Sequence, residues 1–132
     1  RSRGLGDVYK RQGINGKDLQ ILIAEDNDSN YSLVKHILKE YQITRVVNGV
    51  EAVEKVRDEE FDIVLMDMKM PIMGGLEATR KIRELNPIIP IIALTANAFD
   101  ADRVSAMEAG CNAFLTKPLK KEELLELFSF KL

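Results

Sequence analysis

The stretch Ile63-Val-Leu-Met-Asp67 decides the fold of this chain, because four consecutive apolar residues end in a carboxylate. A segment that is apolar at every position, instead of at alternate positions, is typical of a strand covered on both faces. Strands of this kind occur in parallel sheets that carry helices on each side. We therefore predict a strand over residues 62–66, with Asp67 at its carboxyl end.

Four other segments have a similar form, a short apolar run that stops at a polar residue or a turn. The predicted strands cover residues 20–24, 44–47, 91–94 and 113–116. Each strand is followed by a segment whose apolar residues have helical spacing. The predicted helices cover residues 29–41, 50–59, 75–85, 100–109 and 121–128. From Leu19 onward, strand and helix therefore alternate five times.

The apolar positions also predict how the helices are capped and buried. In the first predicted helix, Leu33 and Tyr41 belong to the apolar stripe, and Asp28 or Ser29 is expected to cap the start. In the third predicted helix, Leu85 is expected to face inward. Both helices should then pack one face against the sheet.

This alternation predicts an α/β fold with a five-stranded parallel sheet and five helices. Right-handed crossovers favour a doubly wound, flavodoxin-like arrangement with strand order 2-1-3-4-5. Strands 1, 3 and 4 would then be neighbours in the middle, with strand 5 beside strand 4. Their carboxyl ends carry five polar groups, which should meet at one edge: Glu25, Asp26, Asp67, Thr95 and Lys117.

The chemistry of these groups suits a phosphoryl group and a hard metal ion. Crowded carboxylates repel each other unless a cation lies near them, and Mg²⁺ favours carboxylate and water ligands. Asp67 is a plausible nucleophile, since carboxylates form aspartyl-phosphate intermediates. Lys117 could neutralise one phosphoryl oxygen, and the Thr95 hydroxyl could hydrogen-bond another.

Composition narrows the class of protein. The 132 residues suffice for one domain, and the net charge of −2 gives no indication of a nucleic-acid-binding surface. No apolar stretch approaches the roughly 20 residues that span a bilayer, so we expect no membrane contact by this domain. The single cysteine, Cys111, excludes an internal disulfide and is expected to be a buried apolar residue. A reducing compartment, and hence a cytoplasmic location, is predicted.

The first 18 residues differ from the rest, being rich in Gly, Lys and Arg and lacking hydrophobic periodicity. We interpret residues 1–18 as a mobile tail or linker and residues 19–132 as the folded domain. The string from Asp7 to Gln12 resembles a translated sequencing-adapter fragment. Part of this tail is therefore expected to be non-native.

Taken together, the motifs resemble the receiver domain of two-component response regulators, over about Leu19 to Phe128. They are most similar to receivers attached to hybrid sensor histidine kinases. The motifs that carry the resemblance are Glu25-Asp26-Asn27, Asp67-Met-Lys-Met-Pro71-Ile-Met-Gly-Gly75, Ala93-Leu-Thr-Ala96 and Lys117-Pro118.

The resemblance implies a role for each site residue. Asp67 would take a phosphoryl group from a phosphohistidine on a histidine kinase or a histidine phosphotransfer domain. Thr95 and Lys117 would contact that phosphoryl group. The implied Mg²⁺ ligands are Glu25 (mostly through a bound water), Asp26, Asp67 and the backbone carbonyl of Lys69. The domain would catalyse its own aspartyl phosphorylation and dephosphorylation, and it would not be a conventional enzyme.

The resemblance also implies a conformational switch. Phosphorylation would draw Thr95 inward, and the ring of Phe114 would rotate into the vacated space. The surface formed by the fourth helix, the fifth strand and the fifth helix would then change. The bond between Lys117 and Pro118 would be cis. For Phe114, plain core packing is an equally open interpretation.

Three other functions compete with this one. A haloacid-dehalogenase-like phosphatase also uses a strand-end aspartate, but its chemistry requires a second acid two residues later, where this chain has Lys69. A flavin-binding module should have a first loop rich in Ser, Thr and Gly, whereas the acids from Glu25 to Asp28 would repel a phosphate. A phosphorylation-independent interaction module is the third alternative, and the intact acid set argues against it.

Overall fold

A computed structural model describes residues 18–96 and 100–128 of the chain, and residues 1–17, most of the predicted tail, lie outside this part. Five parallel strands form one sheet in the order β2-β1-β3-β4-β5, as predicted. The strands are β1 (Gln20–Ala24), β2 (Gln42–Val46), β3 (Ile63–Asp67), β4 (Ile91–Thr95) and β5 (Ala113–Thr116). The helices are α2 (Asp28–Ile37), α3 (Gly49–Asp58), α4 (Gly75–Leu85), α5 (Asp100–Ala109) and α6 (Lys121–Leu127).

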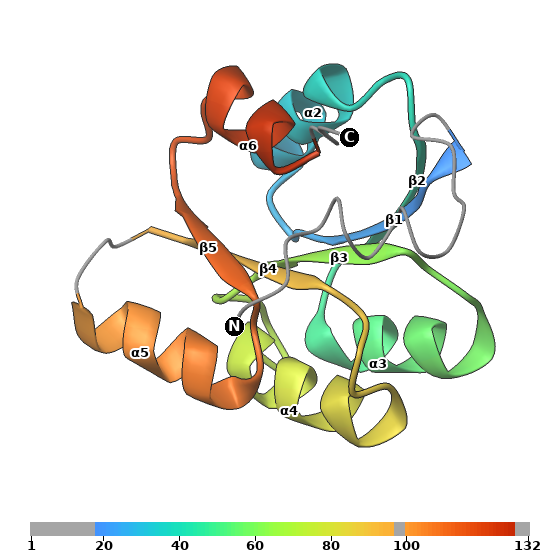
Figure 1. Cartoon of the computed structure of the whole chain (residues 1–132), viewed down its shortest axis with the longest axis vertical. Coiled ribbons are helices and arrows are strands. Elements are labelled where there is room, and N and C mark those ends of the chain that lie inside the picture. Colours follow the sequence, from blue (N-terminus) through green and yellow to red (C-terminus); the bar gives the residue numbers. More distant parts are fainter. Residues whose placement is uncertain (1–17, 97–99, 129–132) are drawn as a thin grey trace.

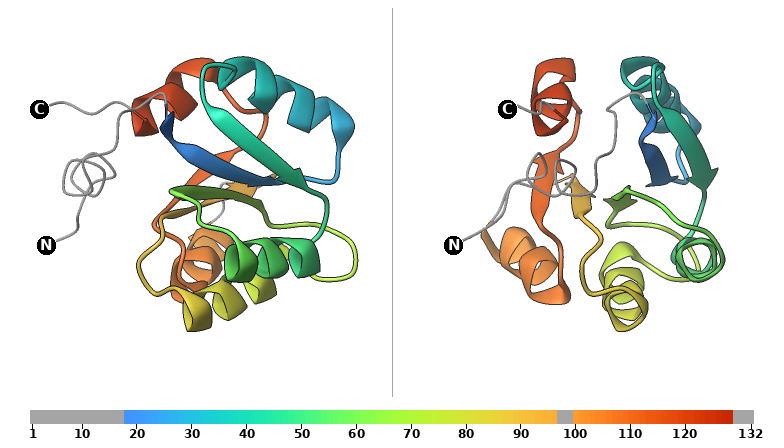
Figure 2. Two further views of the ribbon diagram at one scale, coloured as in Figure 1. Left: turned by 90° about the vertical axis from the view of Figure 1, so that its right-hand side faces the viewer. Right: turned by 45° about the vertical axis from the view of Figure 1, so that its right-hand side comes forward.

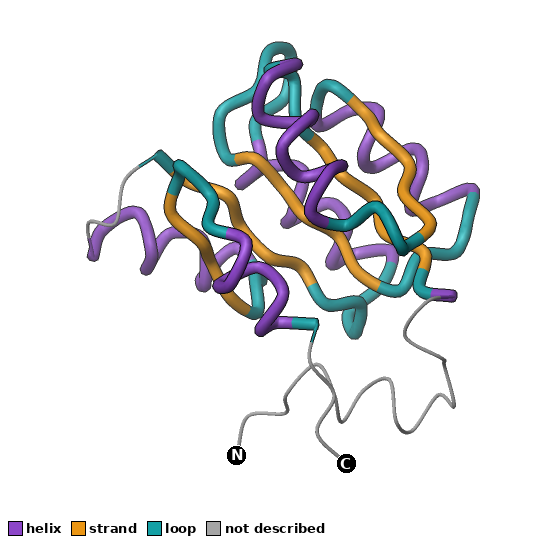
Figure 3. The backbone as a smooth tube through the Cα atoms, turned by 90° about the horizontal axis from the view of Figure 1, so that it is seen from above, coloured by secondary structure: helices purple, strands orange, loops and turns teal. Residues whose placement is uncertain are grey.

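The helices cover both faces of the sheet. Helices α2 and α6 lie on one face, and α3, α4 and α5 lie on the other (Figure 1). Figure 2 shows the same three layers from two further directions, and Figure 3 shows the strands running between the helices when the molecule is seen from above. None of the helices in residues 18–96 and 100–128 is long and apolar enough to cross a membrane.

Each central strand contributes to two cores, because successive side chains point to opposite faces of a sheet. In β3, Ile63 and Leu65 pack toward α2 and α6, whereas Val64 and Met66 pack toward α3, α4 and α5. Every residue of β3 is buried. The near-continuous apolar run is thus explained by helices on both sides. Cys111 is buried in the second core, as expected.

The first helix differs from the prediction at both ends. Its N-cap is Asn27, whose side-chain oxygen accepts a hydrogen bond from the Asn30 N–H at 2.9 Å. The helix ends at Ile37, four residues before the predicted end at Tyr41. Tyr41 keeps its place in the apolar pattern because its ring packs from the following loop against Phe128, with centroids 5.3 Å apart.

Two apolar residues predicted to face the core are partly exposed. Leu33 retains 40% and Leu85 retains 48% of its accessible surface. The buried positions of α2 are Val34 and Ile37, so Leu33 lies at the margin of the apolar stripe. Leu85 is the last residue of α4. These two predictions were wrong.

Strand β2 also begins two residues earlier and ends one residue earlier than predicted. It covers Gln42–Val46 because each of its residues pairs with a residue of β1, from Gln20 to Ala24. The start of this edge strand could not be predicted from an apolar run, because several of its residues are polar. Smaller shifts of one residue occur at the ends of β3, β4, α3 and α6.

Candidate functional site

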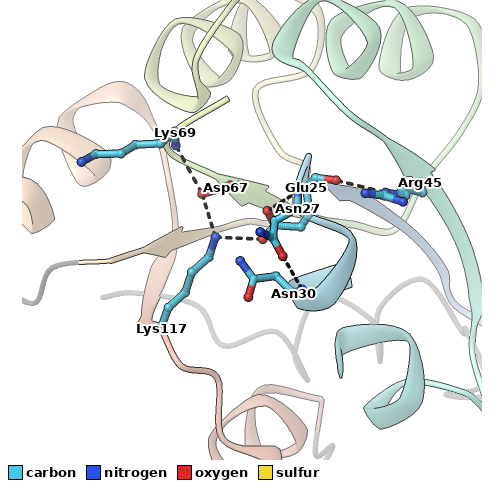
Figure 4. Close-up of polar contacts among 7 residues, drawn as sticks. All are labelled: Glu25, Asn27, Asn30, Arg45, Asp67, Lys69 and Lys117. Atoms are coloured by element: carbon cyan, nitrogen blue, oxygen red, sulfur yellow. Dashed lines mark hydrogen bonds and ion pairs between the residues drawn. The ribbon is translucent and has the colours of Figure 1, made fainter. Parts of the chain in front are cut away.

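The five predicted site residues all lie at the carboxyl edge of the sheet. Asp67 and Thr95 are the last residues of β3 and β4, Glu25 and Asp26 follow β1 directly, and Lys117 follows β5. Figure 4 shows Glu25, Asp67 and Lys117 pointing toward one another from the carboxyl ends of three different strands. The sheet topology alone thus brings together residues that are up to 92 positions apart in the chain (from 25 to 117).

Lys117 connects two buried carboxylates. Its Nζ atom lies 2.8 Å from Glu25 Oε1 and 3.1 Å from Asp67 Oδ1. Glu25 is 1% exposed and Asp67 is 4% exposed, so both charges are removed from water. Buried carboxylates are tolerated only where a cation compensates them. Lys117 supplies that compensation.

Three carboxylates form a cluster that fits a divalent cation. Glu25, Asp26 and Asp67 each offer an oxygen, and these oxygens all lie within 4.8 Å of one another. Among the described residues, Glu25 Oε1 is buried without a partner in hydrogen-bond geometry, its neighbour being the Lys117 ammonium. Hard oxygen ligands of this kind suit Mg²⁺. Three carboxylates beside one lysine leave the cluster with a net negative charge that a further cation would compensate.

The environment of Asp67 makes its charged form less favourable than usual. Burial is the main cause, and the neighbouring Glu25 adds to it, so that the pKa of Asp67 rises from 3.8 to about 6 despite the opposing effect of Lys117. For Lys117, burial alone would lower the pKa, but the contacts with Glu25 and Asp67 raise it. At neutral pH the site therefore holds an ammonium and an ionised but poorly solvated Asp67 carboxylate.

Short loops hold the carboxylates in place. The Asn27 N–H donates to Glu25 Oε2 at 3.2 Å, and the Lys69 N–H donates to Asp67 Oδ1 at 3.3 Å. The side chain of Lys69 is exposed and points away from Asp67 (Figure 4). At Gly75 a Cβ atom would lie only 2.3 Å from the Asp67 carbonyl oxygen, so this close approach of α4 to β3 requires glycine.

Thr95 and Phe114 lie on the neighbouring strands β4 and β5. Thr95 is buried, and its carbonyl accepts a hydrogen bond of 2.7 Å from the Lys117 N–H. Phe114 pairs in register with Ala93 and is half-buried, and the Arg103 guanidinium lies 5.8 Å from its ring centroid. The peptide bond between Lys117 and Pro118 is cis.

A cleft of about 520 Å³ lies over these groups. Its lining includes the five residues predicted to meet at this edge and Lys69, but not Phe114, and it also includes Asp102 and Ser105 from α5, which the sequence did not single out. Both residues lie on α5, the fourth of the five described helices, and their position beside the site depends on how α5 packs against the sheet edge. Arg45 of β2, which contacts the loop after β1, was also missed, because an isolated arginine on an edge strand gives no local signal.

Comparison with known proteins agrees with this geometry. The sequence model of the response regulator receiver domain family matches residues 21–129 of this chain. The chain is 40% identical over 126 residues to the autoinducer 2 sensor kinase/phosphatase LuxQ of Vibrio vulnificus strain YJ016, covering 92% of this chain and 15% of LuxQ. It is 41% identical over 108 residues to the sensor protein EvgS of Escherichia coli K12, covering 80% of this chain and 9% of EvgS.

A solved structure gives the same result. The crystal structure of the receiver domain of sensor histidine kinase PA1611 from Pseudomonas aeruginosa PAO1, with a magnesium ion coordinated in the active site cleft, has a TM-score of 0.79 and 38% sequence identity. The match covers 84% of this chain and 94% of that one. The family model, the sequence relatives and the shared fold lead to one conclusion. This chain belongs to the family of response regulator receiver domains.

Proposed function

We propose that this domain is a phosphoacceptor of a two-component phosphorelay, in which Asp67 takes a phosphoryl group from a phosphohistidine with the help of Mg²⁺. One observation carries the proposal. The Asp67 carboxylate lies 3.1 Å from the Lys117 ammonium and within 4.8 Å of carboxylate oxygens of Glu25 and Asp26. The proposed nucleophile, a lysine ammonium and two further carboxylates that could bind Mg²⁺ therefore share one cleft.

The proposed step is an in-line displacement at phosphorus. An Asp67 carboxylate oxygen attacks the phosphorus atom, the bond from phosphorus to the imidazole nitrogen breaks, and the electron pair of that bond returns to the imidazole. With a pKa of about 6, Asp67 is ionised at neutral pH and available for attack. Lys117 lies where it can neutralise a phosphoryl oxygen, and the buried Thr95 hydroxyl is proposed to hydrogen-bond another.

A bound Mg²⁺ would supply further neutralisation of the phosphoryl charge. Its proposed ligands are Glu25 (mostly through a water), Asp26, Asp67 and the backbone carbonyl of Lys69. Support comes from the cluster of carboxylate oxygens and from the magnesium ion in the related PA1611 receiver. The domain would thereby catalyse its own phosphorylation and dephosphorylation, without being a conventional enzyme.

We further propose that the signal leaves through the surface formed by α5, β5 and α6. Thr95 ends β4 beside Thr116 of β5, and Phe114 lies half-buried two residues earlier on β5. A movement of Thr95 toward a phosphoryl group would change the packing next to Phe114. This is a two-state element biased by one local charge.

The proposed partners are a histidine kinase or a histidine phosphotransfer domain. The relatives LuxQ and EvgS are sensor proteins, and this chain spans only 15% and 9% of their lengths. What those whole proteins sense and control therefore does not carry over to this domain. The phosphohistidine donor is inferred from the receiver family and from the site chemistry.

A small-molecule phosphodonor tests the proposal directly. The protein is incubated with acetyl phosphate and Mg²⁺, and its intact mass is measured. Wild type is expected to gain one phosphoryl group, Asp67→Asn none, and the surface control Asp58→Asn the same as wild type. An unmodified wild type would contradict the proposal. Continuous release of phosphate from p-nitrophenyl phosphate would instead support the haloacid-dehalogenase-like alternative, which the position of Lys69 disfavours.

A further inference from the structure

Arg45 connects the edge strand β2 to the loop that carries two of the proposed cation ligands. Its Nε–H donates to the Glu25 carbonyl oxygen at 3.0 Å, and its Nη2 atom lies 2.9 Å from Asp28 Oδ1 (Figure 4 shows the first contact). Its guanidinium carbon lies 4.4 Å from the centroid of the Tyr31 ring. One side chain therefore contacts the residue before Asp26, the residue two positions after it, and the first turns of α2.

These contacts use the specific shape of arginine. The guanidinium is a planar fork, which can donate in two directions while its face stacks on an aromatic ring. The Arg45 side chain is 23% exposed and that of Asp28 is 90% exposed, so the ion pair is open to water, whereas the hydrogen bond to the Glu25 carbonyl is partly buried. The Glu25 N–H also donates to the Val46 carbonyl at 3.0 Å. Strand β2 thus holds Glu25 through both its backbone and an adjacent side chain.

We propose that Arg45 is a positioning residue for the cation site. By fixing the segment from Glu25 to Asp28, it keeps the carboxylates of Glu25 and Asp26 directed at Asp67, without itself contacting the cation. This inference rests on the proposed function, because the cation in question is the Mg²⁺ of the phosphorylation site. It assigns a role to a residue outside the acid cluster and outside the phosphoryl-binding pair.

Two physical effects of Arg45 have opposite signs, which makes the inference testable. A positive charge near the carboxylates repels a divalent cation, so Coulomb interaction alone predicts that removing Arg45 strengthens Mg²⁺ binding. Positioning predicts the reverse, because a loosened loop must be ordered again when the cation binds. A purely structural role predicts lower stability with unchanged Mg²⁺ affinity of the folded protein. The direction of the change therefore identifies the role.

The experiment is a calorimetric titration of the folded proteins with MgCl₂, with a urea unfolding curve for each variant. Arg45→Met is expected to bind Mg²⁺ roughly tenfold more weakly than wild type, the low end of the range for outer-shell partners of metal ligands. Arg45→Lys is expected to lie between the two, since lysine keeps the charge but lacks the fork. The control Arg57→Met removes an exposed arginine near the end of α3 and should bind like wild type.

The outcomes separate this inference from the proposed function. Unchanged or tighter Mg²⁺ binding by Arg45→Met would overturn the inference while leaving the proposed function in place. If Arg45→Met fails to fold, Arg45→Lys decides, and wild-type affinity in that variant would overturn the inference equally. Failure of the wild type to bind Mg²⁺ would overturn both.

Discussion

The Nζ atom of Lys117 lies 3.1 Å from Oδ1 of Asp67. The same ammonium lies 2.8 Å from Glu25, so one lysine is shared by two buried acids. Burial, and after it the neighbouring Glu25, raise the pKa of Asp67 despite the opposing effect of this lysine. The proposed site is therefore electrostatically strained when no divalent cation is bound.

The first prediction concerns the stability of the metal-free protein. The folded state raises the pKa of Asp67 from 3.8 to about 6, so it binds this proton more tightly than the unfolded state does. The contribution of this proton to the free energy of unfolding is then lost as the pH rises from about 4 through about 6, while the remaining interactions keep the protein folded. Asp67→Asn cannot ionise. Without divalent cations it should be more stable than wild type by about 1–3 kcal/mol at pH 7.

Urea unfolding at several pH values checks this prediction. The difference between Asp67→Asn and wild type should shrink between pH 6 and pH 4, because wild-type Asp67 becomes protonated there. Asp58→Asn, which alters an exposed acid of α3, is the matched control and should show no such gain. A wild type more stable than Asp67→Asn at neutral pH would contradict the electrostatic account.

The second prediction concerns stabilisation by Mg²⁺. A cation that binds only the folded state stabilises it, by about 1.4 kcal/mol at ten times the dissociation constant. The melting temperature of wild type should therefore rise with MgCl₂. Asp26→Asn removes a proposed ligand and should lose most of the rise, whereas Asp58→Asn should retain it. An equal rise in Asp26→Asn and wild type would place the cation elsewhere.

The third prediction concerns the close approach of α4 to β3. A Cβ at Gly75 would lie 2.3 Å from the Asp67 carbonyl oxygen and 2.6 Å from Met68 Cε. Alanine gains at most about 1 kcal/mol of helix propensity, whereas overpacking costs about 1–3 kcal/mol. Gly75→Ala should therefore lower stability and displace Asp67. In Gly74→Ala the nearest contact of the new Cβ would be Met68 O at 3.2 Å, so this variant should lose less stability in chemical denaturation. Equal effects would refute the steric argument.

The fourth prediction concerns Ile72 in the loop after β3. Its φ of 70° lies in the left-handed region, which β-branched residues rarely adopt, and its side chain is 82% exposed. Strain of this kind costs on the order of 1 kcal/mol, and asparagine tolerates the conformation better. Ile72→Asn should raise the free energy of unfolding, whereas the control Ile88→Asn at another exposed isoleucine should not. A destabilised Ile72→Asn would show that this position is not strained.

Much of the fold could be predicted because each apolar run indicates both how its strand is buried and which residue lies at the end of that strand. Ile63–Asp67 is apolar along its whole length since helices cover both faces, and the residue that ends it lies at the ligand-binding edge. The strand ends predicted the meeting of Glu25, Asp67 and Lys117, which the structure places in direct contact.

Other features depended on tertiary contacts that no local pattern records. The start of α2 is set by the Asn27 cap, and the helix ends at Ile37. The apolar spacing continues to Tyr41 because its ring packs against Phe128 from the loop, so the predicted helix was too long. The contact between Arg45 and the Glu25 carbonyl joins residues 20 positions apart and depends on the pairing of β2 with β1. Such a contact is visible only in three dimensions.

The central claim is that Asp67 itself becomes an acyl phosphate. After incubation with acetyl phosphate and Mg²⁺, the protein is treated with borohydride, which reduces an acyl phosphate to an alcohol, and is then sequenced by tandem mass spectrometry. The account predicts homoserine at position 67 and at no other aspartate, with none formed when Mg²⁺ is chelated. Reduction at a different carboxylate, or no reduction at all, would contradict it.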